Sequence, residues 1–247
     1  MSEPTIEVIT MWVNEATLAP FFLRHYSFAD HIRIIDDVDT TDNTAEIVAQ
    51  FPNATLEKFQ FPDMFDNDIA VAKINECYRE SKADWVISVD SDEFVLTENL
   101  KEFLSKQTHN IFYVRLYQVY RNINDKDLDV NLPIKEQRRC GNANAVPGQN
   151  KHGMKPIIAR AGLRNMKWMP GQHNIWNKSR YGTSPEYLLG VHWMYADPLF
   201  AIERKLRGRA RQSKHNLWRG HSVHYNTVTE EEVRKELESH LYDKELF

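Results

Sequence analysis

Residues 83–94 read Ala83-Asp84-Trp85-Val86-Ile87-Ser88-Val89-Asp90-Ser91-Asp92-Glu93-Phe94, an apolar run that stops at two aspartates separated by one residue. Strand-forming side chains fill the run, which predicts a buried strand of an α/β sheet. Open α/β sheets bind ligands at the carboxyl ends of their strands, and residues two apart in an extended chain share a face. We therefore expect Asp90 and Asp92 to point toward one spot.

Two carboxylates on one spot repel each other, and a divalent cation relieves that repulsion. Carboxylate oxygens suit Mg²⁺ or Mn²⁺, which commonly bind one or two carboxylates together with substrate phosphates. An EF-hand loop is excluded, since Val95 stands where that loop needs glycine. Asp-Ser-Asp after a strand can also be a plain turn closed by side-chain hydrogen bonds. From these residues alone, both interpretations are open.

The composition of the chain is that of an ordinary globular protein of 247 residues with a net charge of −4. Cys77 and Cys140 form no Cys-x-x-Cys pair, which argues against a zinc site or a disulfide framework. The sequence shows no apolar run long enough to span a membrane and no signal-peptide pattern at its start. We therefore expect a protein of a reducing compartment, located in the cytoplasm and without a membrane span.

A basic segment covers residues 204–224 and contains no acidic residue. Such a cluster favours an anionic partner. We expect one or two of its cations to contact a diphosphate and most of the others to lie on a solvated helix face, although a grip on an acidic acceptor such as nucleic acid is the alternative. Its basic side chains are Arg204, Lys205, Arg207, Arg209, Arg211, Lys214 and Arg219.

Strand and helix patterns alternate from residue 6 to residue 95, which predicts an α/β fold with a mostly parallel sheet and right-handed crossovers. A strand is then expected over residues 111–120 and a capped terminal helix from Thr229 to about Leu241. We expect a single domain with two halves, 1–115 and 116–247. Within the second half, residues 121–153 are rich in Asn, Asp, Lys, Pro and Gly, and we interpret them as a mobile loop on the acceptor side whose polar side chains are Asn142, Asn144, Gln149 and Asn150.

Four stretches of the first half resemble motifs of the nucleotide-sugar glycosyltransferases with a GT-A fold, the family-two-like group in particular. Residues 36–44 resemble that group's Asp-Asp-x-Ser-x-Asp-x-Thr turn, although Val38-Asp39 replaces the small or polar residues usual there. Residues 13–15 resemble its first strand ending, residues 72–75 occupy the place of the helix before the metal strand, and residues 90–92 are similar to its Asp-x-Asp motif. The resemblance implies the GT-A fold, a Rossmann-like sheet flanked by helices.

The resemblance also implies roles for individual residues. Asp37 would read the base of the donor nucleotide, Asp90 would lie near the ribose or the ion, and Asp92 would bind the metal. Asp-Glu-Phe at residues 92–94 resembles a subset of these enzymes found in glycan synthesis, where Glu93 would support the metal or a substrate hydroxyl. The donor-binding residues implied in this way are Val13, Asn14, Asp37, Lys73, Asn75, Asp90, Arg204 and Lys205.

The second half carries a Lys-x-Ile stretch at residues 155–157, a Gly-x-His turn ending at His173, and a His-Trp-Met-Tyr stretch that begins at His192. Similar glycosyltransferases have these three features, although the last tyrosine is displaced here. Imidazole is an acceptable ligand for Mn²⁺. The resemblance therefore implies His192 as the third metal ligand after Asp90 and Asp92, with His173 as the alternative ligand or an acceptor-site residue.

These features predict a metal-dependent glycosyltransferase that uses Mn²⁺ or Mg²⁺ and moves a sugar from a nucleoside diphosphate to a hydroxyl acceptor such as a glycan. Uridine diphosphate (UDP) is the first candidate for the nucleoside diphosphate. An inverting reaction needs a general base, and Glu93 and His173 are only weak candidates. The first alternative is a glycosyltransferase or binding protein that acts on nucleic acid through residues 204–224. The second is a Mg²⁺-dependent nucleotidyltransferase, against which the absence of glycine from residues 11–16 argues.

Overall fold

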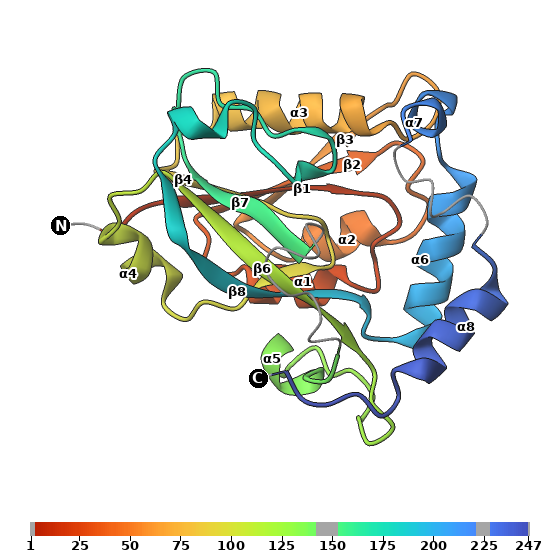
Figure 1. Cartoon of the computed structure of the whole chain (residues 1–247). Helices are drawn as coiled ribbons and strands as arrows, with labels where there is room; N and C mark the ends of the chain where they lie inside the picture. Colours follow the sequence, from red (N-terminus) through yellow and green to blue (C-terminus); the bar gives the residue numbers. More distant parts are fainter. Residues whose placement is uncertain (1–2, 142–152, 221–227, 247) are drawn as a thin grey trace.

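The structure is a computed structural model that describes residues 3–141, 153–220 and 228–246. Eight strands form one sheet in the order β3-β2-β1-β4-β7-β6-β8-β5 (Figure 1). The pairs β1–β2, β1–β4, β2–β3 and β6–β8 are parallel, and β7 and β5 run antiparallel to their neighbours. This is the mostly parallel α/β sheet of the GT-A type, and it confirms the predicted fold class.

The first half follows the predicted alternation closely, because strand and helix periods are local signals. Asp66 caps the longest helix here by accepting hydrogen bonds from the backbone N–H groups of Asp68 and Ile69. The elements are β1 (Ile6–Trp12), α1 (Ala19–His25), β2 (His31–Asp37), α2 (Thr44–Val48), β3 (Ala54–Phe59), α3 (Asn67–Glu80) and β4 (Trp85–Ser88).

The second half adds strands to the same sheet, and β7 enters between β4 and β6. The boundary between residues 115 and 116 falls inside β6, so the two halves share a strand and the division into halves stays a proposal. The Thr229 capping box and the terminal helix are confirmed. The elements are β5 (Glu93–Val95), α4 (Leu100–Ser105), β6 (Ile111–Tyr120), α5 (Ile134–Gln137), β7 (Met154–Arg160), η2 (Pro170–Gln172), η3 (Lys178–Arg180), β8 (Thr183–Tyr195), α6 (Pro198–Ala210), α7 (Lys214–Trp218) and α8 (Glu230–Ser239).

The segment that we expected as a mobile loop is described as far as Gly141 and contains α5. The buried Arg138 holds this part in place: its Nε donates a hydrogen bond of 2.6 Å to the Ala196 carbonyl, and its Nη1 donates one of 3.0 Å to the Lys126 carbonyl. The described part is therefore anchored to the junction of β8 and α6. The four polar residues expected to meet an acceptor (Asn142, Asn144, Gln149, Asn150) lie outside the described residues.

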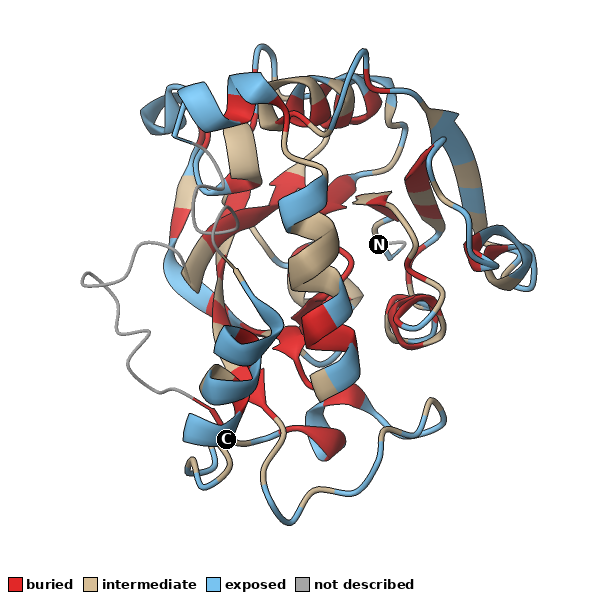
Figure 2. Ribbon diagram, turned by 90° about the vertical axis from the view of Figure 1, so that its right-hand side faces the viewer, coloured by how far each residue is buried: buried red, intermediate tan, exposed pale blue. Residues whose placement is uncertain are grey.

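Helices cover both faces of the sheet, with α3 on one face and α1 and α2 on the other (Figure 1). One core cluster joins α1 residues such as Phe22 to strand residues such as Ile34, and a second joins Ile74 of α3 to Ile9 and Val86. Burial is highest in the strands and declines toward the outer sides of the helices (Figure 2). In the part of the chain that the structure describes, no helix combines the length and the apolar character needed to cross a bilayer.

The strand β5, which follows the aspartates, is fixed to α1. The Tyr26 hydroxyl donates a hydrogen bond of 2.9 Å to the Glu93 carbonyl and accepts one of 3.1 Å from the Val95 amide. The His25 Nε2 lies 2.9 Å from the Val95 carbonyl, and the edge of its ring meets Phe94. The C-terminal end of α1 thus fixes the position of β5 against the core.

The pKa of His25 is lowered by burial to about 4, although its hydrogen bond to Val95 acts in the opposite direction. Because the unfolded value of about 6.5 is higher, the unfolded chain takes up a proton first as the pH falls. The stabilising contribution is therefore complete above pH 6.5 and is lost as the pH falls toward 4, by at most about 3 kcal/mol at ~1.36 kcal/mol per pH unit. Urea unfolding of His25→Gln is expected to show a flatter pH profile in this window. The exposed His215→Gln is the control, and identical profiles for His25→Gln and the wild type would contradict the expectation.

Candidate active site

A cavity of about 920 Å³ opens beside the carboxyl ends of β1 and β4. Its walls come from both halves of the chain: the end of β1, the start of α3, the residues after β4, parts of β6, β7 and β8, the η2 turn, and one face of α6 with Glu236 of α8. This is the edge at which α/β sheets hold their ligands. Residues 91 and 92 do form a turn, but Asp90 and Asp92 both line the cavity, so the turn lies at a cleft.

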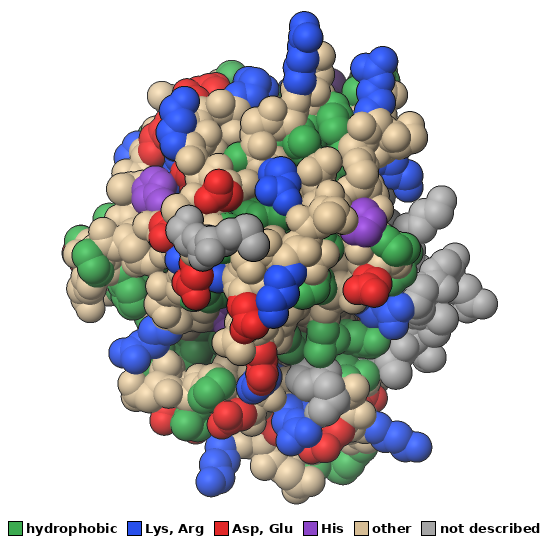
Figure 3. Space-filling model, turned by 90° about the vertical axis from the view of Figure 1, so that its left-hand side faces the viewer, with side chains coloured by type: hydrophobic (Ala, Val, Ile, Leu, Met, Phe, Trp, Pro, Cys, Tyr) green, Lys and Arg blue, Asp and Glu red, His purple; other side chains and the backbone are tan. Residues whose placement is uncertain are grey.

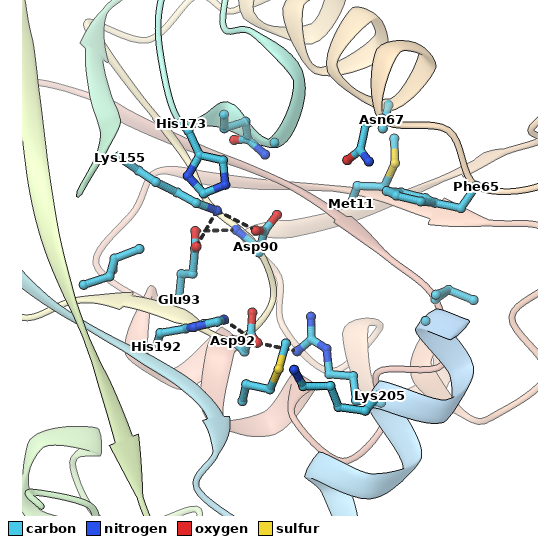
Figure 4. Close-up of a pocket in the computed structure, with 18 of the residues that line it drawn as sticks. Met11, Phe65, Asn67, Asp90, Asp92, Glu93, Lys155, His173, His192 and Lys205 are labelled. Carbon is cyan, nitrogen blue, oxygen red and sulfur yellow. Dashed lines mark hydrogen bonds and ion pairs between the residues drawn. The ribbon is translucent and has the colours of Figure 1, made fainter. Parts of the chain in front are cut away.

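Asp92 is almost fully enclosed at this edge, with 1% of its side chain exposed. Its Oδ2 lies 2.9 Å from His192 Nε2 and 3.1 Å from Arg204 Nη1 (Figure 4). Burial alone would raise the pKa of Asp92, but Arg204 and His192 lower it well below its usual range. The strand pairing brings His192 here, because Glu93 of β5 lies opposite His192 of β8. The structure thus unites two of the three predicted metal ligands.

Asp90, the third predicted ligand, faces a lysine. Lys155 Nζ lies 2.7 Å from Asp90 Oδ2 and also pairs with Glu93, whose Oε2 accepts a hydrogen bond from the Asp90 amide (Figure 4). Burial lowers the pKa of Lys155, but the two carboxylates raise it above its usual range, so the lysine is an ammonium ion. Both oxygens of Glu93 are engaged in this way. The geometry therefore gives Glu93 a supporting place behind Asp90.

The donor-binding residues implied at the ends of β1 and β2 divide into two groups. Val13 lines the cavity, and Asp37 is buried beside it in an ion pair with Arg211. Asn14 is in the left-handed region, with a φ of 49°, and its Oδ1 accepts hydrogen bonds from the backbone of Thr41 and Asp42. Asn14 therefore shapes the loop after β2 and is not among the cavity-lining side chains.

Helix α3 reaches the cavity with residues other than those the resemblance implied. Lys73 lies 2.7 Å from Glu57 and 3.1 Å from Glu76, and Asn75 exchanges hydrogen bonds with the backbone of Trp168. Neither side chain is among those that line the cavity, because both lie on other faces of the helix. The lining side chains of α3 are Asn67, Ala70, Val71 and Ile74.

Much of the basic segment turns inward, which corrects the expectation of a solvated face for most of it. Arg204, Arg207 and Arg211 recur at helical spacing and line the cavity together with Lys205. Arg207 lies 3.2 Å from Glu15, and Arg211 pairs with Asp37. The side chains that do lie exposed are Arg209, Lys214 and Arg219.

His173 lines the cavity at the end of the η2 turn, as the Gly-x-His pattern led us to expect (Figure 4). Gly171 adopts a φ of 70° there, a conformation that favours glycine. The Ser88 hydroxyl donates a hydrogen bond to the Gln172 side chain and ties the turn to the end of β4. The turn is thereby held against the strand that carries the aspartates.

Three residues at the cavity had no role in the sequence interpretation. Glu15 carries a pKa that burial raises and that Arg204 and Arg207 lower less strongly. Glu236 of α8 accepts hydrogen bonds of 3.2 Å from the Tyr120 hydroxyl and 2.7 Å from the Tyr195 hydroxyl. Glu15 and Lys155 lie in stretches that resemble family motifs, residues 13–15 and 155–157, but neither side chain was assigned a role. Pairings between distant strands and helices place all three, so local patterns did not reveal them.

Two groups of side chains can be compared as holders of a divalent ion. Ligand atoms of Asp66, Asp68 and His215 lie within 4.8 Å of one another. However, Asp66 is committed to the α3 cap and to a hydrogen bond from the Ser213 hydroxyl. At the cavity, Asp92 Oδ1 is buried and has no hydrogen-bond donor among the described residues. An unsatisfied carboxylate oxygen beside an imidazole suits Mn²⁺ or Mg²⁺, so Asp92 and His192 fit such an ion.

Comparisons with solved structures give similarities at low identity. A crystal structure of S. aureus TarS matches 98% of this chain and 44% of its own, with 12% identity and a TM-score of 0.46. The mannosyltransferase PcManGT from Pyrobaculum calidifontis, in complex with GDP-Man and Mn²⁺, matches 48% of this chain and 36% of its own, with 20% identity and a TM-score of 0.35. The chain therefore spans less than half the length of either protein. No curated protein matches it.

The family models give a more specific result. The model described as glycosyl transferase family 2 matches residues 8–164, which include β1, the turn after β2, α3, and the aspartates after β4. The matched range is more than half of the chain. The protein therefore belongs to glycosyl transferase family 2.

Proposed function

We propose that the protein is a metal-dependent glycosyltransferase that transfers a sugar from a nucleoside diphosphate to a hydroxyl acceptor such as a glycan. UDP is the first candidate for the nucleoside diphosphate. One observation carries the proposal: Asp90, Asp92, Arg204 and Arg207 line the same cavity at the carboxyl ends of β1 and β4. Carboxylates that can hold a divalent ion and cations that can hold a diphosphate are the two complementary parts of a nucleotide-sugar site. Membership of glycosyl transferase family 2 supports it.

On the donor side, Val13 and Asp37 are proposed to receive the base, and Asp90 the ribose. Asp92 and His192 would hold Mn²⁺ or Mg²⁺, which supplies positive charge to the diphosphate leaving group. Arg204 and Lys205 would stabilise the same charge directly, since fixed cations aimed at a developing charge are effective in an enclosed site. In the structure, Arg204 is paired with Asp92, and diphosphate oxygens would replace the carboxylate as its partner.

For the acceptor side we propose Gln118, Tyr120, Tyr195 and Glu236, which all line the cavity. Polar and aromatic side chains of this kind suit a hydroxyl-rich acceptor. As candidate general base, His173 is favoured over Glu93, because both Glu93 oxygens are engaged by Lys155 and the Asp90 amide. His173 lines the cavity and can reach an acceptor hydroxyl there.

The alternatives drawn from the sequence carry less weight. Arg204, Arg207 and Arg211 point to acidic partners within the protein, which leaves fewer cations for a nucleic acid. On the face away from α6 and α7, drawn in Figure 3, positive and negative side chains are interspersed as well. A nucleotidyltransferase is disfavoured by the family to which the chain belongs.

Thermal unfolding in the presence of Mn²⁺ and a panel of nucleotide sugars tests the proposal. A donor present at about 100 times its dissociation constant stabilises the folded state by ~2.7 kcal/mol, which raises the unfolding temperature by roughly 5–10 °C in a protein of this size. We expect a UDP-sugar to give this shift and a guanosine diphosphate sugar to give less. No shift with any nucleotide sugar, with or without Mn²⁺, would argue against a donor site here.

A further inference from the structure

The carboxylates at the cavity already contain a cation of the protein itself. Lys155 is 6% exposed, and its Nζ lies between Asp90 Oδ2, at 2.7 Å, and Glu93. Asp90 has 46% of its side chain exposed and lines the cavity, whereas the side chain of Glu93 is 2% exposed. The ammonium group thus lies between Asp90 and Glu93, at the wall of the cavity that Asp90 faces (Figure 4).

The sheet fixes this lysine in place. In the antiparallel pair of β4 and β7, Ile87 lies opposite Ile158. Lys155 lies three residues before Ile158 on β7, Asp90 lies three residues after Ile87, and the ion pair of 2.7 Å joins them beyond the end of β4. Glu93 is held on β5, where its backbone pairs with β8 and receives the hydrogen bond from Tyr26. A lysine fixed from several strands is a built part of the site.

We propose that the Lys155 ammonium is the resident cation of this carboxylate cluster: it neutralises Asp90 and Glu93 and leaves Asp92 and His192 as the protein ligands of a divalent ion. The inference rests on the proposed function, since it concerns the ion of that site. The negative charge of Asp90 is already neutralised by Lys155, so the protein alone binds a divalent ion weakly. Donor phosphates supply the remaining ligands, in keeping with the preference of Mg²⁺ for substrate phosphates. Lys155 therefore couples metal binding to donor binding.

The test is a titration of the full chain with Mn²⁺ alone, with no nucleotide present. Free Mn²⁺ is measured by electron paramagnetic resonance, and the unfolding temperature is followed in the same samples. Lys155→Met releases Asp90 and Glu93, and we expect it to bind Mn²⁺ at least tenfold more tightly than the wild type and to gain thermal stability from the ion. Lys155→Arg keeps the charge and is expected to bind as the wild type does.

Lys73→Met is the matched control, because Lys73 also joins two carboxylates, Glu57 and Glu76, but is not among the side chains that line the cavity. It is expected to leave Mn²⁺ affinity within about twofold of the wild type, so a tightening as large as that of Lys155→Met would overturn the proposal. Equal or weaker Mn²⁺ binding by folded Lys155→Met would also overturn it.

A second pair of variants covers the case in which Lys155→Met does not fold. The Glu93→Gln variant and the Glu93→Gln, Lys155→Gln double variant differ only at residue 155, where the double variant lacks the positive charge. Relative to the wild type, the double variant has lost one charge of each sign. We expect the double variant to bind Mn²⁺ at least tenfold more tightly than the single one, and equal affinities would overturn the proposal. Donor binding is measured separately, so a failure of the proposed glycosyltransferase function is seen in the nucleotide-sugar assay and not in this one.

Discussion

Asp92→Asn is expected to lower sugar transfer, or donor hydrolysis, by about 100- to 1,000-fold, the loss that follows removal of one group that stabilises the reacting charge. Asp92 is the enclosed carboxylate at which His192 and Arg204 meet, and its Oδ1 has no hydrogen-bond donor among the described residues. Asparagine keeps the shape and removes the charge that an ion needs. The measurement is release of the nucleoside diphosphate from the preferred donor in the presence of Mn²⁺.

Asp68→Asn is the matched control for this result. It removes a carboxylate from the group formed by Asp66, Asp68 and His215, which also brings ligand atoms close together. We expect Asp68→Asn to keep activity within about threefold of the wild type, and circular dichroism is expected to show both variants folded. If Asp68→Asn lost activity and folded Asp92→Asn did not, the ion would have to be assigned to the other group.

Phe94→Ala is expected to destabilise the protein by about 3–5 kcal/mol, the usual cost of truncating a buried phenylalanine. The ring is 0% exposed and lies between α1 and β8, with its centroid 5.1 Å from that of His25 and 5.4 Å from that of Trp193. A loss of this size is a large part of the ~5–15 kcal/mol by which domains are stable. Urea unfolding followed by circular dichroism measures it.

The controls separate lost packing from a general effect of truncation. Leu199→Ala shortens a side chain that is 68% exposed and is expected to change the free energy of unfolding by less than about 0.5 kcal/mol. Phe94→Leu fills part of the cavity and is expected to lose less than Phe94→Ala. A Phe94→Ala variant as stable as Leu199→Ala would show that the ring does not anchor β5.

Local sequence patterns were sufficient for the elements of the first half. The apolar run at residues 85–89 and the alternation of strands and helices before it predicted the parallel part of the sheet, because a period of two or 3.6 residues depends only on neighbours in the chain. The pattern of the Asp-x-Asp motif at the end of that run also predicted the edge at which the cavity opens. Family resemblance predicted His192 and His173 at the cavity, and the structure places both there.

Local patterns could not predict contacts between residues that are far apart in the sequence. The entry of β7 between β4 and β6 brings Lys155 next to Asp90, and the position of Arg207 on α6 places it next to Glu15. The same limit explains Lys73 and Asn75: their position along the chain matched a motif, but their place around the axis of α3 directed them to Glu57 and to the Trp168 backbone.

By itself, the sequence predicted an α/β fold, a resemblance to the nucleotide-sugar glycosyltransferases, and two aspartates at the end of a buried strand. Only the tertiary structure decided which charges face those aspartates: Lys155 for Asp90, and His192 with Arg204 for Asp92. The physical reason is that strand order and register, set by the burial of whole faces, bring together residues that are far apart in the chain.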